Sequence, residues 1–187
     1  MRRMIAEERG FTLVELLVYM LLMLFVLAVA GGLLSSTLIQ STTVRTVDES
    51  STAAQLAADS IESGIRNSSD FSLTSPVGDD QMIVARIASN DATLTWSCVA
   101  WYYSATDGSL RMSRSSTAIA APTSAQLATW ALLVDGVQPI SGSEIFTTTA
   151  GRRLVIAFNG LAGDHPPVAI TTSAFGRAGA TGSVSCF

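Results

Sequence analysis

The sequence predicts an α+β fold in which one long N-terminal helix packs on an antiparallel β-sheet. Three observations support this fold class. Residues 16–34 form an apolar run without a charged residue, residues 44–65 carry apolar residues at helical spacing, and strand-like runs separated by turn residues begin near residue 82. The helix therefore comes first, and the sheet is built from the chain that follows it.

The apolar run from Leu16 to Leu34 is long enough to cross a membrane. As a helix, its 19 residues span about 28 Å, close to the roughly 30 Å hydrocarbon thickness of a bilayer. A cleaved secretory signal has a shorter apolar core followed by a small-residue cleavage site, whereas this run passes without such a site into Ser35-Ser36-Thr37. The arginines before the run predict that residues 1–10 stay in the cytoplasm and that the chain beyond about residue 36 lies outside.

The helical pattern continues beyond the apolar run. Apolar residues recur at three- and four-residue steps, interrupted once by Ser51, on a segment that also carries acidic side chains. One helix from Phe11 to about Arg66 is therefore predicted, with an apolar inner half and an amphipathic outer half. Gly64 and the polar residues 67–70 mark its end. Glu62 is placed on the face opposite the apolar stripe, which consists of Val44, Val47, Ala54, Ala58, Ile61 and Ile65.

Strand-like runs follow Pro76. The first two cover residues 82–87 and 93–103, and Asp107-Gly108 then predicts a hairpin turn into residues 110–112. Residues 121–129 are predicted to be a loop with a helical turn. Further strands are predicted at 130–134, 145–148, 153–158 and 168–172, with turns at Asp135-Gly136, Asn159-Gly160, Gly163 and Pro166-Pro167.

The charge balance gives no support for a nucleic-acid partner. The chain has a formal charge of −4, and its eleven basic residues are all arginine. Residues 1–10 carry three arginines and two glutamates, so the rest of the chain is more acidic than the whole. An acidic body without a broad basic patch repels polyphosphate, so nucleic acid is an unlikely partner.

The sequence predicts neither a metal site nor a catalytic site. Cys98 and Cys186 are the two cysteines, neither lies in a CxxC pair, and His165 is the one histidine. In an exported domain a Cys98–Cys186 disulfide is the natural interpretation, with two buried thiols as the alternative. Because the chain also has no G-x-S-x-G nucleophile elbow, we expect no cofactor and no enzyme activity.

One carboxylate, Glu15, lies at the beginning of the apolar segment. A charged side chain within a membrane span is costly unless it is paired, so such a residue is a functional candidate by default. A tolerated carboxylate near the membrane interface is the alternative interpretation.

The surrounding stretch "GFTLVELLV", Gly10 to Val18, resembles the processing motif of type IV prepilins and type II secretion pseudopilins. In that family a membrane peptidase cuts after a glycine on the cytoplasmic side, the new N-terminal residue is N-methylated, and the fifth mature residue is usually glutamate. The resemblance thus implies cleavage between Gly10 and Phe11, N-methylation of Phe11 and an assembly role for Glu15. It also implies a pilin-like fold.

The resemblance gives Glu15 a partner, the cationic α-amine of Phe11 on a neighbouring subunit. Opposite charges attract more strongly in a low dielectric than in water, and removing one member of a buried pair typically costs about 3–5 kcal/mol. The pair would therefore fix the axial register of helices in a filament. Residues 101–111 and the "LLVDGV" stretch at 132–137 are also similar to segments of minor pilins of the PilW and GspJ-like type.

These expectations combine into one functional interpretation, a minor pilin or pseudopilin in the cytoplasmic membrane. Its parts are a leader (1–10), a single transmembrane helix (11–36), an amphipathic extension (37–67) and an exported β-rich domain (68–187) that reaches the cell surface or periplasm in a filament. Its partners would be other pilins, the prepilin peptidase and lipid. The alternatives are a signal-anchored exported enzyme or binding domain that does not polymerise, and a DNA-binding competence pilin.

Overall fold

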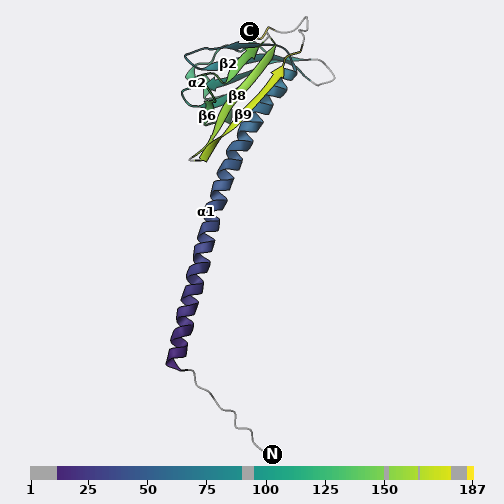
Figure 1. Cartoon of the computed structure of the whole chain (residues 1–187). Helices are drawn as coiled ribbons and strands as arrows, with labels where there is room; N and C mark the ends of the chain where they lie inside the picture. Colours follow the sequence, from purple (N-terminus) through teal and green to yellow (C-terminus); the bar gives the residue numbers. More distant parts are fainter. Residues whose placement is uncertain (1–11, 90–94, 150–151, 164, 178–184) are drawn as a thin grey trace, which may run out of the picture. The chain divides into compact units, whose positions relative to one another are not determined.

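The computed structural model describes residues 12–89, 95–149, 152–163, 165–177 and 185–187, without the side chains of residues 37–43 and 46. The chain divides into two compact units, residues 1–45 and 46–187. One helix, α1 (Leu13–Arg66), belongs to both units. The fold class is the predicted one, a long N-terminal helix followed by antiparallel sheet (Figure 1).

The first unit contains the apolar part of α1. Its segment Leu13–Ser36 has 24 residues and a mean hydropathy of 2.7, which makes it long and apolar enough to cross a membrane. Its large apolar side chains are exposed, from Leu13 at 82% to Leu34 at 64%. A helix that is apolar on every side requires lipid or other helices around it.

The second unit contains two antiparallel sheets. The first has five strands in the order β1-β2-β3-β4-β5, so each strand pairs with the next one in the sequence. Its tight turn is at Gly108, which has a positive φ of 62° between the paired residues Ser104 and Ser109. The strands are β1 (Ser68–Thr74), β2 (Gln81–Ala88), β3 (Trp96–Ser104), β4 (Ser109–Ser115) and β5 (Ala131–Val134), and the short helix α2 (Ser124–Leu127) lies between the last two.

The second sheet is built around strand β8, which pairs with each of the other three strands. Along one edge β8 pairs with β7 near its beginning and with β6 near its end, and it pairs with β9 over most of its length. All of these pairings are antiparallel. The strands are β6 (Val137–Pro139), β7 (Phe146–Thr149), β8 (Arg153–Ala162) and β9 (His165–Phe175).

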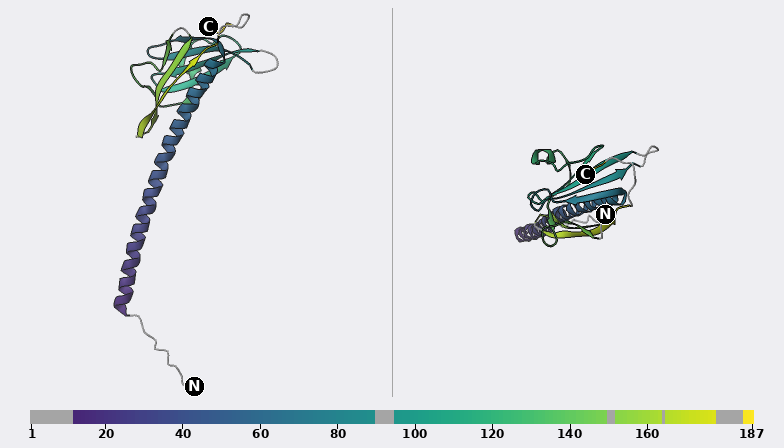
Figure 2. Two further views of the ribbon diagram at one scale, coloured as in Figure 1. Left: turned by 45° about the vertical axis from the view of Figure 1, so that its right-hand side comes forward. Right: turned by 90° about the horizontal axis from the view of Figure 1, so that it is seen from above.

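The main core lies where the outer part of α1 meets both sheets. Ala54, Ala58, Ile61 and Ile65 are buried there, and they belong to one cluster with apolar residues of both sheets. The view from above shows the helix between the strands of the first sheet and those of the second (Figure 2). Helix and β8 come so close that a Cβ added at Gly160 would lie 3.1 Å from the Cβ of Ala54.

One buried amide side chain connects the two sheets. Gln81, at the start of β2, is 2% exposed. Its Nε2 donates to the carbonyl oxygen of Phe146 at 2.9 Å, and its Oε1 accepts from the backbone N–H groups of Ile145 and Phe146 at 2.8 and 2.9 Å. The amide oxygen and one of the two amide N–H groups of Gln81 are therefore hydrogen-bonded to the backbone where β7 begins.

The other face of the first sheet carries a second, smaller apolar cluster. Met82, Val84, Ala100 and Tyr102 point to this face, while their neighbours Ile83, Ala85, Val99 and Trp101 point to the main core. Leu127 of α2 and Cys186 cover the outward-facing side chains. Because both faces of β2 and β3 are buried, these strands appear in the sequence as continuous apolar runs instead of alternating ones.

Several local predictions were wrong. The strands form two sheets instead of one. The helix ends at Arg66 as predicted, but the strand β1 that begins at Ser68 was not predicted. Asn159-Gly160 and Pro166-Pro167 were predicted as turns but lie within β8 and β9. Val44, predicted to be on the buried stripe, is 58% exposed. Residues 93–94 of the second predicted strand lie outside the described residues.

Candidate functional site

The candidate assembly residue Glu15 lies in the first turn of α1. Thr12 precedes the helix, and its Oγ1 accepts a hydrogen bond from the Glu15 backbone N–H at 3.3 Å. Its carbonyl oxygen accepts from the Leu16 N–H at 3.2 Å, so Thr12 acts as the N-cap of the helix. The Glu15 carboxylate is thereby held beside the positive end of the helix dipole, where a negative charge is favoured.

This cap was not predicted, although the spacing Thr12-x-x-Glu15 is the signature of a capping box. Thr12 therefore marks the start of the helix, and Glu15 supplies the one carboxylate of its first turn.

Glu15 has no counterion among the residues that the structure describes. Its side chain is exposed, and within the parts that the structure describes no arginine or histidine forms an ion pair with it. The neighbouring side chains Leu16 and Leu17 are 50% and 57% exposed. Gly10 and Phe11, the predicted cleavage and methylation positions, lie outside the described residues.

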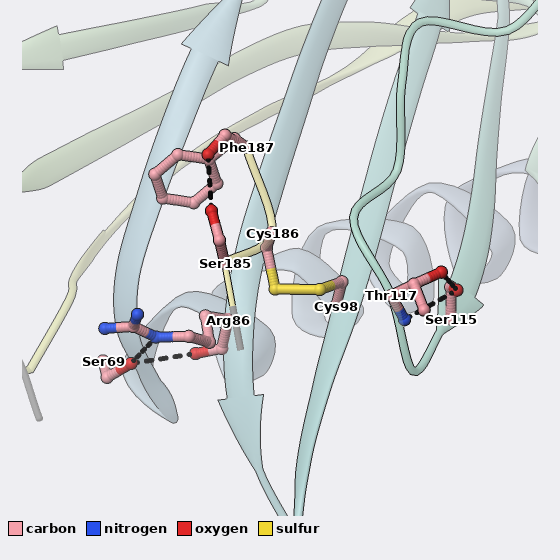
Figure 3. Close-up of a disulfide and its surroundings, with 8 residues drawn as sticks. All are labelled: Ser69, Arg86, Cys98, Ser115, Thr117, Ser185, Cys186 and Phe187. Atoms are coloured by element: carbon pink, nitrogen blue, oxygen red, sulfur yellow. Dashed lines mark hydrogen bonds between the residues drawn. A yellow bond between two sulfur atoms is a disulfide. The ribbon is translucent and has the colours of Figure 1, made fainter. Parts of the chain in front are cut away.

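Cys98 and Cys186 form a disulfide on the outer face of the first sheet (Figure 3). The two sulfur atoms are 1.99 Å apart, the Cα atoms are 5.5 Å apart, and both residues are at least 98% buried. The backbone N–H of Ile119 donates to the Cys186 carbonyl oxygen at 3.4 Å. The bond thus fastens residues 185–187 to strand β3, among the apolar side chains of the second cluster.

Asp80, directly before β2, has structural partners. The Asp80 carboxylate accepts from the Tyr102 hydroxyl at 2.6 Å and from the Ala105 N–H at 2.8 Å, which joins the β1–β2 loop to the end of β3. Burial, reinforced by the hydrogen bond to Asp80 and its negative charge, raises the pKa of Tyr102 above its ordinary value. Burial likewise raises the pKa of Tyr103, with smaller contributions from Asp80 and Asp79.

The described residues contain no candidate metal centre. Among them, no three or more His, Cys, Asp and Glu side chains are grouped to hold a metal ion. His165, at the start of β9, is part of no such group.

Comparison with known families gives one match. Residues 6–31 match the family model described as the prokaryotic N-terminal methylation motif. The matched segment contains Gly10, Phe11 and Glu15 together with much of the apolar helix. No curated protein and no solved structure matches the chain.

Proposed function

We propose that this chain, which carries the type IV prepilin and pseudopilin signature at residues 6–31, is a minor structural subunit of a type IV pilus or a type II secretion-like filament. The signature marks substrates of prepilin peptidase, and the family that carries it is structural. The single observation that carries the proposal is that the signature begins before, and extends into, a helix that is long and apolar enough to cross a membrane.

Processing is the first step of the proposed function. The peptidase cuts between Gly10 and Phe11, removes residues 1–10 and leaves Phe11 to be N-methylated. Intact-mass measurement and N-terminal sequencing of the chain, expressed with and without the peptidase, test this step. We expect the peptidase-dependent loss of residues 1–10 and the gain of one methyl group. The proposal is contradicted if the full-length chain is recovered both with and without the peptidase, or if the chain is cut near Ser35.

The proposed membrane arrangement follows from the charge pattern. Residues 11–36 span the membrane once, residues 37–67 extend the helix, and residues 68–187 form the exported domain. The arginine-bearing leader keeps residues 1–10 in the cytoplasm. Protease added to intact spheroplasts is expected to digest the β-rich domain, whereas a domain that stays protected until the membrane is dissolved contradicts this orientation.

Assembly depends, in this proposal, on Glu15. Its carboxylate is exposed on an apolar helix and has no cation beside it in the described part of its own chain. The Phe11 α-amine of a neighbouring subunit supplies the missing charge, because an α-amine is mostly protonated at neutral pH. The pair stabilises one axial offset between neighbouring helices and thereby sets the register of the filament.

Charge-removing and charge-retaining substitutions test this role. Glu15→Gln keeps the size of the side chain but leaves the neighbour's ammonium without a counterion, so crosslinking to partner pilins should fall strongly while processing continues. Glu15→Asp should be milder, because it retains the charge at a shorter reach. Glu49→Gln is the control, since Glu49 is an exposed carboxylate of the same helix outside the apolar segment. Normal crosslinking by Glu15→Gln identifies Glu15 as a tolerated interfacial carboxylate.

The minor-subunit assignment is supported by two segments of the β-rich unit. The hairpin of β3 and β4 contains the stretch similar to PilW- and GspJ-like proteins, and "LLVDGV" forms β5, its turn and the start of β6. A minor subunit is expected in pili or pseudopili at far lower copy number than the major subunit. Quantitative mass spectrometry of sheared filaments measures that ratio, and a ratio near one contradicts the assignment.

A further inference from the structure

We propose that a cavity at one end of the first sheet binds a neutral saccharide. The cavity has a volume of about 520 Å³ and lies within the unit formed by residues 46–187. Three chain segments converge on it, namely the β1–β2 loop, the β3–β4 turn and the segment around α2. Its volume is in the range of small-molecule sites, about 300–1,000 Å³. The proposal is independent of filament assembly, because none of the lining residues belongs to the apolar part of α1.

The lining is rich in groups that hydrogen-bond to hydroxyls. Two carboxylates accept, one guanidinium donates, and each side-chain hydroxyl can do both. A sugar hydroxyl likewise donates and accepts, so a lining that mixes all three kinds of group suits a polyhydroxylated ligand. The polar members are Asp80, Tyr102, Ser104, Thr106, Asp107, Arg111, Thr123 and Ser124.

Several of these groups are held in place before any ligand arrives. Asp80 is fixed by its hydrogen bonds from the Tyr102 hydroxyl and the Ala105 N–H. Thr123 and Gln126 form a reciprocal capping box at the start of α2. Arg111 donates from Nη1 to the Trp130 carbonyl oxygen at 3.4 Å, which leaves most of its five donors for other partners. A rigid polar wall reduces the entropy that binding has to overcome.

A buried hydroxyl lies on the same face of the sheet as the strand residues that line the cavity. Ser109 is the cross-strand partner of Ser104, and its residue is 4% exposed. Among the described residues its Oγ has no hydrogen-bond partner. Because Leu110 points into the main core, Ser109 points to the sheet face that also carries Arg111. An unsatisfied hydroxyl therefore lies on the face of the sheet that carries the cavity, instead of in the main apolar core.

The charges favour an uncharged ligand. An anionic ligand that approaches Arg111 also meets the carboxylates of Asp80 and Asp107, and a cationic ligand meets Arg111. The apolar side chains of Val77 and Leu127 offer contact surface for the C–H groups of a sugar ring. A neutral saccharide segment satisfies both parts of the lining, whereas a peptide would need a row of apolar pockets or an open strand edge.

Binding is tested on the full chain, purified in an oligo-ethylene-glycol detergent, because detergents with sugar headgroups would compete. Saturation-transfer NMR is recorded with neutral oligosaccharides built from glucose, galactose, mannose or N-acetylglucosamine. A sialylated oligosaccharide, a chitosan oligomer and an unstructured peptide represent anionic, cationic and peptide ligands. We expect transfer to at least one neutral oligosaccharide. Absence of transfer to all the neutral ones, or stronger transfer to a charged glycan or the peptide, overturns the proposal.

Paired variants locate the bound saccharide. Asp107→Asn and Arg111→Gln should each weaken binding at least tenfold, and Ser124→Ala, an exposed hydroxyl with little effect on folding, should weaken it about threefold. Arg114→Gln is the matched control, because Arg114 lies on the same strand but does not line the cavity. Near-ultraviolet circular dichroism checks the fold of each variant. The assignment is overturned if Ser124→Ala and Asp107→Asn bind the saccharide as tightly as the wild type. It is also overturned if Arg111→Gln and Arg114→Gln lose the same affinity, because the ligand then lies elsewhere.

Discussion

The indole ring of Trp101 lies directly against the backbone of Gly64. A Cβ added at Gly64 would lie 2.2 Å from Cη2 and 2.5 Å from Cζ2 of that ring. Trp101 is 1% exposed, and its Nε1 donates to the Ser60 Oγ at 3.3 Å, so two successive turns of α1 contact the indole. Gly64 therefore sets the distance between the outer part of α1 and the first sheet.

Gly64→Ala should destabilise the β-rich unit. Alanine is favoured over glycine within a helix by about 1 kcal/mol, but the clash with a confined ring should cost about 1–3 kcal/mol and outweigh that gain. Chemical unfolding followed by tryptophan fluorescence measures the change. Ser63→Ala is the control, because Ser63 is exposed. Trp101→Phe in the Gly64→Ala background should recover part of the loss, and a stabilised Gly64→Ala protein contradicts the packing argument.

Glu62→Ala should also be destabilising. The sequence predicted that Glu62 lies on the face opposite the apolar stripe, but in the structure its carboxylate contacts the sheet. The Thr172 hydroxyl donates to Glu62 Oε2 at 2.7 Å, which connects α1 with β9. Arg66 forms an ion pair with the same carboxylate, but its side chain is 63% exposed, so that pair contributes little. Loss of the hydrogen bond should cost about 1–2 kcal/mol in denaturant melts. Asp59→Ala, at an exposed position, should stay within about 0.5 kcal/mol.

Thr172→Val separates the two contacts of Glu62. If the hydrogen bond to Thr172 is the important one, adding Glu62→Ala to Thr172→Val should cost much less than it does in the wild type. If the stability losses of Thr172→Val and Glu62→Ala are additive instead, the contribution of Glu62 comes from its ion pair with Arg66.

Removal of the disulfide should weaken the β-rich unit without changing its strand order. Cys98 and Cys186 are 88 residues apart, and closing a loop of that length corresponds to about 4–5 kcal/mol of unfolded-state entropy. The double variant Cys98→Ala/Cys186→Ala should therefore unfold at a markedly lower denaturant concentration. Thiol labelling of the unreduced, denatured wild type should detect no free cysteine, whereas labelling of both residues contradicts the bond.

Alkaline pH should destabilise the β-rich unit. Burial and Asp80 raise the pKa of Tyr102, and burial raises that of Tyr103, so both keep their protons when folded. Tyrosines of the unfolded chain ionise near pH 10. Stability is thus fully present below about pH 10 and falls as the pH rises further, because the unfolded chain then binds fewer protons than the folded one. Unfolding measured at pH 8 and 11 should show the decline, and Tyr102→Phe should reduce it.

Ultraviolet titration supplies the matching observation. The chain has three tyrosines, and those at positions 102 and 103 should ionise only at higher pH or on unfolding. Ionisation of Tyr102 and Tyr103 near pH 10 in the folded protein contradicts the assigned shifts.

The helix and most strands were predictable because their signals are local. The apolar stretch Met82 to Ile87 indicates a strand, and Asp107-Gly108 indicates a hairpin, before any partner is known. The helix end near Arg66 was predicted, but the strand directly after it was not. Residues 68–70 have the composition of a loop, and they become β1 by pairing with β2, a tertiary effect that overrides local propensity.

The remaining differences have the same origin in distant contacts. Gly160 resembles a turn residue, but it allows Ala54 to approach β8. Pro166 and Pro167 are tolerated near the beginning of β9, an edge position where a missing N–H costs little. Glu62 lies four residues after Ala58, at the border of the buried stripe, so its helical position alone did not reveal Thr172. The position of Glu15 was predictable from a linear motif, whereas its proposed partner belongs to another chain.

The long-range hydrogen bonds of Gln81 affect the folding rate of the β-rich unit. The Gln81 amide bonds to the backbone at residues 145 and 146, which are 64 and 65 residues away, and Glu62 reaches Thr172 across 110 residues. Contacts between such distant residues give a high contact order, and domains of that kind fold in milliseconds to seconds instead of microseconds. Neither sheet can bury its inner face until the other has formed, since they share one core with the helix. A newly synthesised chain is therefore exposed to proteases and aggregation for that interval, and stopped-flow refolding should show slow recovery of tryptophan fluorescence.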